Sequence, residues 1–295
     1  MITTMPELFD IEDDGAWKDY LDEHGYVVIN DVLSNEKQMA LFTKFMNDWN
    51  HVSPYFDFNN MDSWDEDNCP MWWEKGMVYG FGLAHSDFQW DLRTDNRIRN
   101  IWERLHNTKE LVVSFDGFSV FLSDDQEPGM WLHTDQNYRN KLYSVQGAYN
   151  FQEVGENDAG FVVVPGSHKT FNRKIDINCD FVRVNECDPH VELAEKLLIP
   201  ANCFTLWNSK TIHANVGMNK DMELNRLTSY MCYFPKADRS IEVKDARIEG
   251  YYNAENCSHY ALRHDVKMPA LGNFKNINPL LDEEGNIPKE RMDLI

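Results

Sequence analysis

The sequence predicts a mainly β fold in which helices flank two packed sheets. Apolar residues recur at helical spacing mainly before about residue 110. From about residue 111, short apolar and β-branched runs alternate with turns rich in Gly, Pro, Asn and Asp. Helices first and regularly spaced short strands afterwards are typical of a double-stranded β-helix core (a jelly roll, cupin-like) with helices packed outside it.

We expect a single domain over residues 1–295, because a chain of this length can bury one large core and no repeat or low-complexity block divides it. Within it we expect a helical part over about 1–110, the jelly-roll core over about 111–235, and a wrapping C-terminal segment over about 236–295 that mixes polar and aromatic residues without a clear period.

The N-terminal elements follow from local signals. Helical spacing of apolar residues from Trp17 predicts a helix that Gly25 ends, and the apolar run at 26–29 predicts a buried strand. Ser34 opens a second helix, whose apolar positions up to Trp49 follow a 3.6-residue rhythm. Residues 98–105 predict another helix.

The segment 51–92 differs from its neighbours. It is rich in Asp, Asn, Trp, Phe and Gly and has no sustained period, so its composition predicts a long loop whose aromatic side chains pack on other parts of the protein. A functional alternative is a lid with glycine hinges at Gly76, Gly80 and Gly82.

Six short runs in the second half of the chain predict strands, because each is apolar or β-branched and is bounded by turn residues. They lie at 111–114, 117–122, 143–151, 161–164, 203–207 and 227–234.

Composition narrows the class of protein. The formal net charge is −21, from 28 Lys and Arg against 49 Asp and Glu, and no basic cluster offers a surface for nucleic acid. No apolar run approaches the roughly 18 residues of a membrane span, and the N-terminus lacks the pattern of a signal peptide. The six cysteines form no CxxC motif. We therefore expect a reduced, cytoplasmic protein.

Two histidines and one aspartate form the candidate metal site. His133 and Asp135 are two positions apart, so on a strand both side chains point to the same side. His213 follows the predicted strand 203–207 and a turn, where an opposing strand would deliver it. Two histidines and a carboxylate are the set that binds Fe(II) on one face and leaves other positions open.

A second HxD pair, His85 and Asp87, is the rival for the metal. It lies in the irregular segment, whereas His133 lies among the predicted strands and precedes His213 by 80 residues (213 minus 133), room for about four strands and their turns. We prefer the pair at 133 and expect His85 to bond Asp87 or a backbone carbonyl instead.

Three further residues are candidates for binding a 2-oxo acid. Arg226 opens a predicted strand, and an arginine in an apolar strand is costly unless an anion meets it; its planar fork suits a carboxylate. A structural ion pair is the alternative. Thr228 shares the face of Arg226 two positions on, and Gln146, in the predicted strand 143–151, is another cofactor-binding candidate.

The chain resembles the phytanoyl-CoA dioxygenase-like (PhyH) family of Fe(II)/2-oxoglutarate oxygenases over roughly residues 16–235. Four stretches carry the resemblance: HGYVVINDVLS at 24–34, HTDQ at 133–136, DAGFVVVPGSHK at 158–169, and Ile212-His213 with Arg226. The resemblance implies a jelly-roll core, with His133, Asp135 and His213 as iron ligands and Arg226 as the 2-oxoglutarate anchor. The acidic balance does not favour the CoA ester that gives the family its name.

We therefore expect an Fe(II)- and 2-oxoglutarate-dependent dioxygenase that uses O2 to hydroxylate a small molecule and releases succinate and CO2, with ascorbate as a possible stimulant. Neither nucleic acid nor membrane is expected as a partner, and the sequence does not indicate an oligomeric state. Three alternatives remain open: an oxygenase acting on protein or nucleic acid, a jelly-roll metalloenzyme that needs no 2-oxoglutarate, and a non-catalytic scaffold of the same fold.

Overall fold

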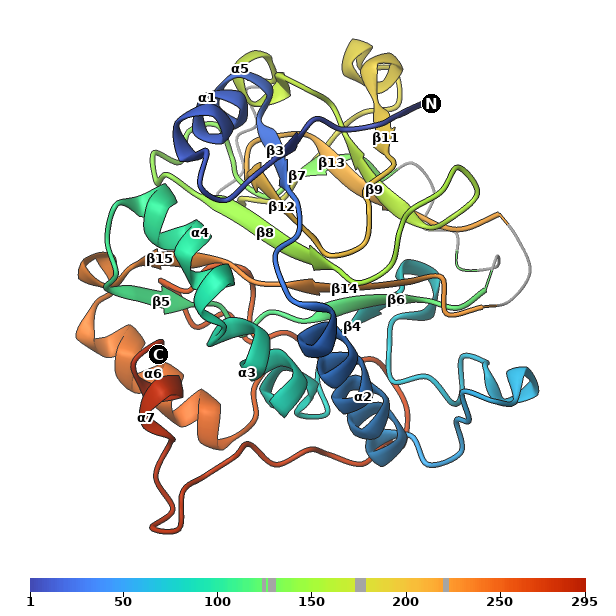
Figure 1. The fold of residues 1–295 in the computed structure, drawn as a ribbon, viewed down its shortest axis with the longest axis vertical. Helices are drawn as coiled ribbons and strands as arrows, with labels where there is room; N and C mark the ends of the chain where they lie inside the picture. Colours follow the sequence, from blue (N-terminus) through green and yellow to red (C-terminus); the bar gives the residue numbers. More distant parts are fainter. Residues whose placement is uncertain (124–125, 127–130, 173–178, 220–222) are drawn as a thin grey trace. The chain divides into compact units, whose positions relative to one another are not determined.

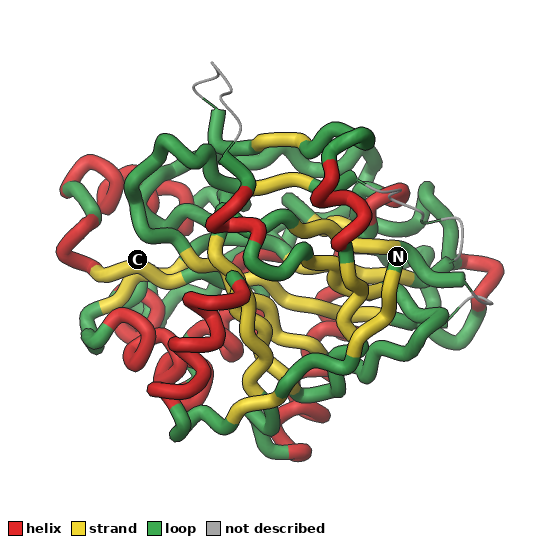
Figure 2. The backbone as a smooth tube through the Cα atoms, turned by 90° about the horizontal axis from the view of Figure 1, so that it is seen from above, coloured by secondary structure: helices red, strands yellow, loops and turns green. Residues whose placement is uncertain are grey.

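The structure is a computed structural model that describes residues 1–123, 126, 131–172, 179–219 and 223–295; the other residues are grey in Figures 1 and 2. The chain forms two compact units. The first unit comprises Met1–Asp31 and Phe121–Leu227, and the second comprises Val32–Val120 and Thr228–Ile295.

The first unit contains most of the strands. Its helical elements are α1 (Asp14–His24), α5 (Ser167–Thr170) and the 3-10 helix η4 (Pro189–Leu193). Its strands are β1 (Ile2–Thr4), β2 (Leu8–Phe9), β3 (Tyr26–Ile29), β7 (His133–Thr134), β8 (Val145–Asn150), β9 (Gly160–Val163), β10 (Val182–Arg183), β11 (Glu195–Leu197), β12 (Cys203–Asn208) and β13 (His213–Val216). Strand β14 (Arg226–Tyr230) begins in this unit and continues in the second.

Two sheets make up the core of the first unit (Figure 1). One has six strands in the order β1-β11-β9-β13-β7-β10, and the other contains β2-β3-β12-β8 in adjacent positions. Trp207 of β12 packs across onto Phe161 of β9, with ring centroids 5.0 Å apart, so the two sheets face each other. This arrangement confirms the predicted mainly β, jelly-roll class.

An apolar cluster packs on the outer face of the six-stranded sheet, which is the face opposite to His133 and His213. Its buried members are Leu132, Val162, Val164, Phe171, Val182, Val184, Ala194, Ile212 and Ala214. Several of these alternate in sequence with His133 and His213, as the period of two along a strand requires.

The second unit is mainly helical. Its α-helices are α2 (Asn35–Val52), α3 (Asp87–Arg93), α4 (Asn96–His106), α6 (Ile241–Tyr252) and α7 (Lys289–Met292). Its 3-10 helices are η1 (Met61–Ser63), η2 (Trp73–Lys75), η3 (Leu83–His85) and η5 (Lys236–Asp238). Its strands form the antiparallel pairs β4 (Met77–Val78) with β6 (Phe118–Phe121), and β5 (Leu111–Val113) with β15 (Tyr233–Pro235).

Local chemistry explains where the first helices begin and end. Gly25 ends α1 in the left-handed conformation (φ 78°), and a Cβ there would lie 2.4 Å from both His168 Nδ1 and Thr211 Oγ1. The Ser34 side chain caps α2 by accepting a hydrogen bond from the Lys37 amide.

The predicted elements match the structure in most places. All six predicted strand ranges contain strands, although 227–234 holds two, β14 and β15. The prediction of an irregular loop over 51–92 was incomplete, because β4 and most of α3 lie there, and the predicted tail missed α6. The lid hypothesis and the three-part division of the domain stay predictions.

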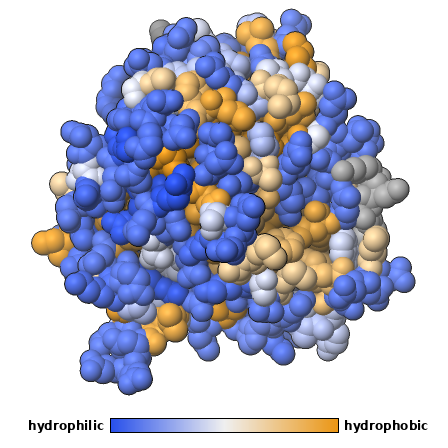
Figure 3. All heavy atoms as spheres, viewed as in Figure 1, coloured by the Kyte–Doolittle hydropathy of each residue, from blue (hydrophilic) through white to orange (hydrophobic). Residues whose placement is uncertain are grey.

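The surface and the cysteines agree with the composition. On the face drawn in Figure 3, hydrophilic residues form most of the surface. All six cysteines are free thiols. Among the described residues, no helix is both long and apolar enough to cross a membrane. The cytoplasmic location stays a prediction.

Candidate metal centre

The strand register brings the two histidines to one face of the six-stranded sheet. His133 of β7 pairs directly with His213 of the antiparallel strand β13. Directly paired residues on antiparallel strands point to the same side, and their Cβ atoms lie about 4.5–5.5 Å apart. Asp135, two residues after His133, shares that side.

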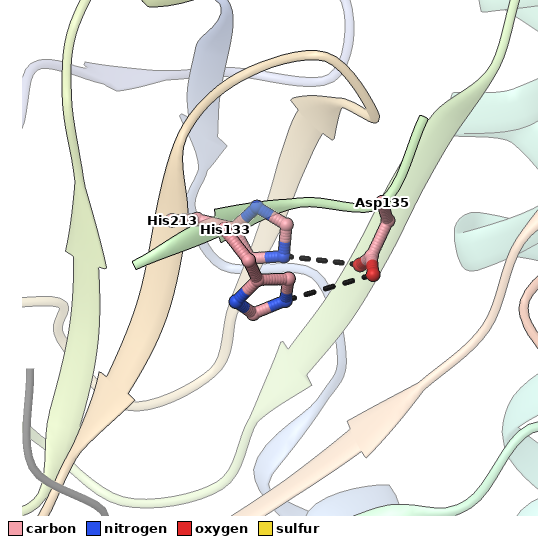
Figure 4. Close-up of side chains that lie close together, drawn as sticks. All are labelled: His133, Asp135 and His213. Carbon is pink, nitrogen blue, oxygen red and sulfur yellow. Dashed lines mark ion pairs between the residues drawn. The ribbon is translucent and has the colours of Figure 1, made fainter. Parts of the chain in front are cut away.

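The three side chains converge as a metal site requires (Figure 4). Their ligand atoms all lie within 4.8 Å of one another, and theirs is the one group of three or more His, Cys, Asp or Glu that could hold a metal ion among the described residues. His133 Nε2 lies 3.6 Å from Asp135 Oδ1, and His213 Nε2 lies 3.2 Å from Asp135 Oδ2.

Backbone carbonyls fix the protonation of both rings. His133 Nδ1 lies 3.0 Å from the carbonyl oxygen of Trp131, and His213 Nδ1 lies 2.9 Å from that of Thr211. A carbonyl oxygen can only accept, so each Nδ1 carries the hydrogen and donates it. In the neutral ring, Nε2 then presents its lone pair to Asp135, which is the usual arrangement of a metal-binding histidine.

The electrostatics of the three residues fit a bound cation. Burial lowers the pKa of His133, so its ring is neutral at pH 7. Burial alone would raise the pKa of Asp135, but the positive charge and the hydrogen bonds that the His133 and His213 rings offer when protonated outweigh burial and hold this pKa well below its usual range. A neutral nitrogen lone pair facing a buried carboxylate is unfavourable on its own and becomes favourable when a cation binds between them.

Aromatic side chains hold the histidine rings in place. The ring of His133 contacts Trp131, stacked at 4.5 Å, and Phe181, tilted at 4.8 Å. The ring of His213 packs against Trp207 at 5.5 Å. These contacts restrict rotation of the rings and keep both Nε2 atoms directed at Asp135.

Gln146 joins the site from the opposing sheet. It lies in β8, and its Nε2 donates a hydrogen bond to Asp135 Oδ2 at 2.9 Å. The sequence singled out Gln146 for cofactor binding, and the contact found is with the carboxylate of the metal site. A direct role of Gln146 in binding a co-substrate stays a prediction.

Arg226 lies beside the same strand that carries His213. Its guanidinium is buried, donates to Asn215 Oδ1 at 2.8 Å and lies over the Phe121 ring. Asn215 is two residues beyond His213 on β13, hence on the same face and about 7 Å along the strand. A short dicarboxylate bound at the metal site could therefore reach the Arg226 guanidinium with its far carboxylate.

The remaining sequence candidates lie in the second unit. Thr228 is buried in β14 two residues after Arg226, and its role stays a prediction. His85 is buried and its Nε2 lies 2.8 Å from the Glu255 carbonyl oxygen, while Asp87 pairs with Arg291 at 2.6 Å. The structure thus brings His133, and not His85, together with Asp135 and His213, and the metal ligands stay a prediction. The backbone-carbonyl alternative for His85 was right.

Three residues of the site escaped sequence reasoning. Asn215 could have been suspected, because it lies two positions after His213 in a strand and so shares its face. Trp131 lies two positions before His133, just outside β7, and could have been suspected from that closeness in the sequence. Phe181 gave no signal, since only the pairing of β10 with β7 brings it to His133.

Comparisons with known proteins show the fold. No family model matches the chain. It is 27% identical over 269 residues to the Ava biosynthesis cluster protein O of Aspergillus versicolor, covering 83% of this chain and 86% of that protein.

Among solved structures, it is similar to the epimerase SnoN in complex with Fe3+, alpha ketoglutarate and nogalamycin RO (TM-score 0.52, 16% identity, 76% of this chain and 84% of the other). It is also similar to EctD from S. alaskensis with 2-oxoglutarate and 5-hydroxyectoine (TM-score 0.52, 12% identity, 78% of each chain). At such identities these likenesses establish a shared fold, and both of these structures contain 2-oxoglutarate.

Proposed function

We propose that the chain is an Fe(II)- and 2-oxoglutarate-dependent dioxygenase of the PhyH type, which hydroxylates a small molecule and releases succinate and CO2. The observation that carries the proposal is the pair of buried imidazoles whose Nε2 atoms face Asp135 while backbone carbonyls accept from Nδ1. Two histidines and a carboxylate with open positions are the donor set of Fe(II) oxygenases.

Each residue has a distinct task in this proposal. His133, Asp135 and His213 hold the iron, and Gln146 fixes the orientation of the Asp135 carboxylate. Arg226 holds the distal carboxylate of 2-oxoglutarate, oriented by Asn215. When bound, iron with 2-oxoglutarate and O2 supplies the oxidising power for an unactivated carbon, so the protein has to position the substrate and exclude water.

Two comparisons support a small-molecule substrate. The Aspergillus relative is named for a biosynthesis cluster, and the two similar structures hold nogalamycin RO and 5-hydroxyectoine. The acidic balance of the chain supports the same choice over nucleic acid.

The test is succinate formation from 2-oxoglutarate with Fe(II), O2 and ascorbate, with and without a library of small metabolites. We expect succinate to rise with one class of metabolite, and a product 16 mass units heavier would identify hydroxylation (one oxygen atom added). The Asp135→Ala variant is the control and should form none. Metal-dependent turnover that does not consume 2-oxoglutarate would favour a 2-oxoglutarate-independent metalloenzyme instead.

A further inference from the structure

The edge strand β10 presents two side chains to the metal face. β10 is the last strand of the six-stranded sheet and pairs antiparallel with β7, Arg183 opposite His133. Paired residues share a face, so Arg183 lies on the side of the metal ligands, and so does Phe181 two positions earlier. The intervening Val182 lies on the opposite face, in the outer apolar cluster.

Phe181 combines contact with a metal ligand and exposure to solvent. Its ring centroid is 4.8 Å from that of His133, yet 47% of the residue is exposed. The exposed part of the ring can therefore contact a ligand that approaches His133 from solvent. Asp135, whose side chain is 19% exposed, shows that solvent reaches the site.

Arg183 adds a positive charge next to this aromatic surface. Its side chain is exposed, and within the described ranges that side chain forms no hydrogen bond or ion pair. Its Cβ lies about 4.5–5.5 Å from that of His133, as for any directly opposed pair, so the guanidinium can extend over the open side of the site.

We propose that Arg183 and Phe181 form the subsite for the primary substrate, and that this substrate is an organic carboxylate with an apolar body. Arg183 binds the carboxylate through its planar fork, and Phe181 covers the adjoining apolar carbons. The inference rests on the proposed oxygenase function. The carboxylate at Arg183 is not the 2-oxoglutarate carboxylate assigned to Arg226. Arg226 is bound to Asn215 on β13, whereas Arg183 lies on β10, and β7 separates these two strands.

An alternative explanation is that Arg183 only protects the edge of the sheet. Charged residues on edge strands discourage pairing with other chains. That role would be satisfied by lysine or glutamate and would give no preference for a carboxylate, so ligand binding separates the two explanations.

The experiment measures affinity for 3-phenylpropionate and for its amide by ligand-observed NMR. The protein is loaded with Zn(II), which suits the same ligands without turnover, and saturated with 2-oxoglutarate so that the co-substrate site is occupied. We expect the wild type to prefer the acid over the amide by at least about tenfold, since a charge-assisted hydrogen bond is lost with the amide. Arg183→Gln should abolish the preference, and Arg183→Lys should retain part of it.

Two further variants complete the design. Phe181→Leu should weaken the binding of acid and amide alike and keep the preference. Arg139→Gln removes the same charge from the exposed loop after Asp135 and should behave as wild type. Equal affinities in the wild type, or an unchanged preference in Arg183→Gln, would overturn the subsite. If the wild type binds neither metal nor 2-oxoglutarate, the oxygenase proposal itself fails; if both bind normally and only the preference is absent, the subsite alone fails.

Discussion

Gln146 Nε2 donates a hydrogen bond of 2.9 Å to Asp135 Oδ2, and this contact joins the two sheets of the first unit at the metal site. The donor is a neutral amide from the opposing sheet, so it restrains the carboxylate without competing with a metal for charge. The same oxygen faces His213 Nε2 at 3.2 Å, while Oδ1 faces His133. The hydrogen bond from Gln146 thereby restrains the orientation of the Asp135 carboxylate, with Oδ1 toward His133 and Oδ2 toward His213.

The first prediction is that Gln146→Leu weakens metal binding by about 10- to 100-fold, the usual cost of removing a group that orients a metal ligand. Anaerobic titration with Fe(II), or calorimetry with Co(II), measures the effect. Gln38→Leu, which removes a partly exposed amide on α2, is the control. Wild-type metal affinity in Gln146→Leu would show that packing alone orients Asp135.

The second prediction separates the metal ligands from the rejected pair. Alanine at His133, Asp135 or His213 should abolish Fe(II) binding while far-UV circular dichroism stays unchanged, because the apolar cluster on the outer face of the sheet holds the strands without the metal. His85→Ala should bind Fe(II) as the wild type does. It should instead lower the free energy of unfolding by about 2 kcal/mol, since it removes a buried hydrogen bond and leaves a cavity.

The third prediction concerns Arg226. Removing one partner of a desolvated charge pair costs about 2–5 kcal/mol, so Arg226→Ala should weaken 2-oxoglutarate binding by a factor of about 30 or more, measured on the metal-loaded protein. Lysine should restore only part of the affinity, because an ammonium cannot form the bidentate contact.

Asn215→Asp provides a sharper test of the same anchor. It places a carboxylate against the guanidinium that Asn215 now accepts from, and should weaken 2-oxoglutarate by competing for Arg226. If both Arg226→Ala and Asn215→Asp keep wild-type affinity for 2-oxoglutarate, another cation is the anchor.

Much of this arrangement could be read from local patterns. The 26–29 strand, the Ser34 cap and the HxD pair each depend on residues within a few positions of one another, where side-chain chemistry and strand period decide the outcome. The density of predicted strands around each HxD pair also indicated that His133, rather than His85, would converge with His213, as the structure shows.

The features that were missed depend on packing. Helix α6 buries Arg247, Gly250 and Tyr251 rather than an apolar stripe, so no hydrophobic period revealed it. Strand β10 is two residues long, and its pairing with β7 joins positions 50 apart in the chain (183 minus 133), so neither propensity nor period could place Phe181 on His133.

The last prediction uses the buried ring of His85 to set the pH dependence of stability. Burial, assisted by the charge of Arg93, lowers the pKa of His85 from 6.5 to about 3. The folded protein therefore binds this proton less readily than the unfolded chain does.

Between about pH 6.5 and pH 3, unfolding takes up a proton at His85, so the free energy of unfolding falls as the pH falls, by up to about 1.4 kcal/mol per pH unit from this group. Above pH 6.5 both states are neutral there and the contribution vanishes. Urea unfolding at pH 7.5, 6.0 and 5.0 measures the slope. His85→Gln has no titrating ring at this position. Between pH 6.0 and pH 5.0 its free energy of unfolding should therefore fall less steeply with falling pH than that of the wild type, by about 1 kcal/mol per pH unit, whatever its stability at pH 7.5. An unchanged slope would mean that His85 takes up a proton equally well in the folded protein.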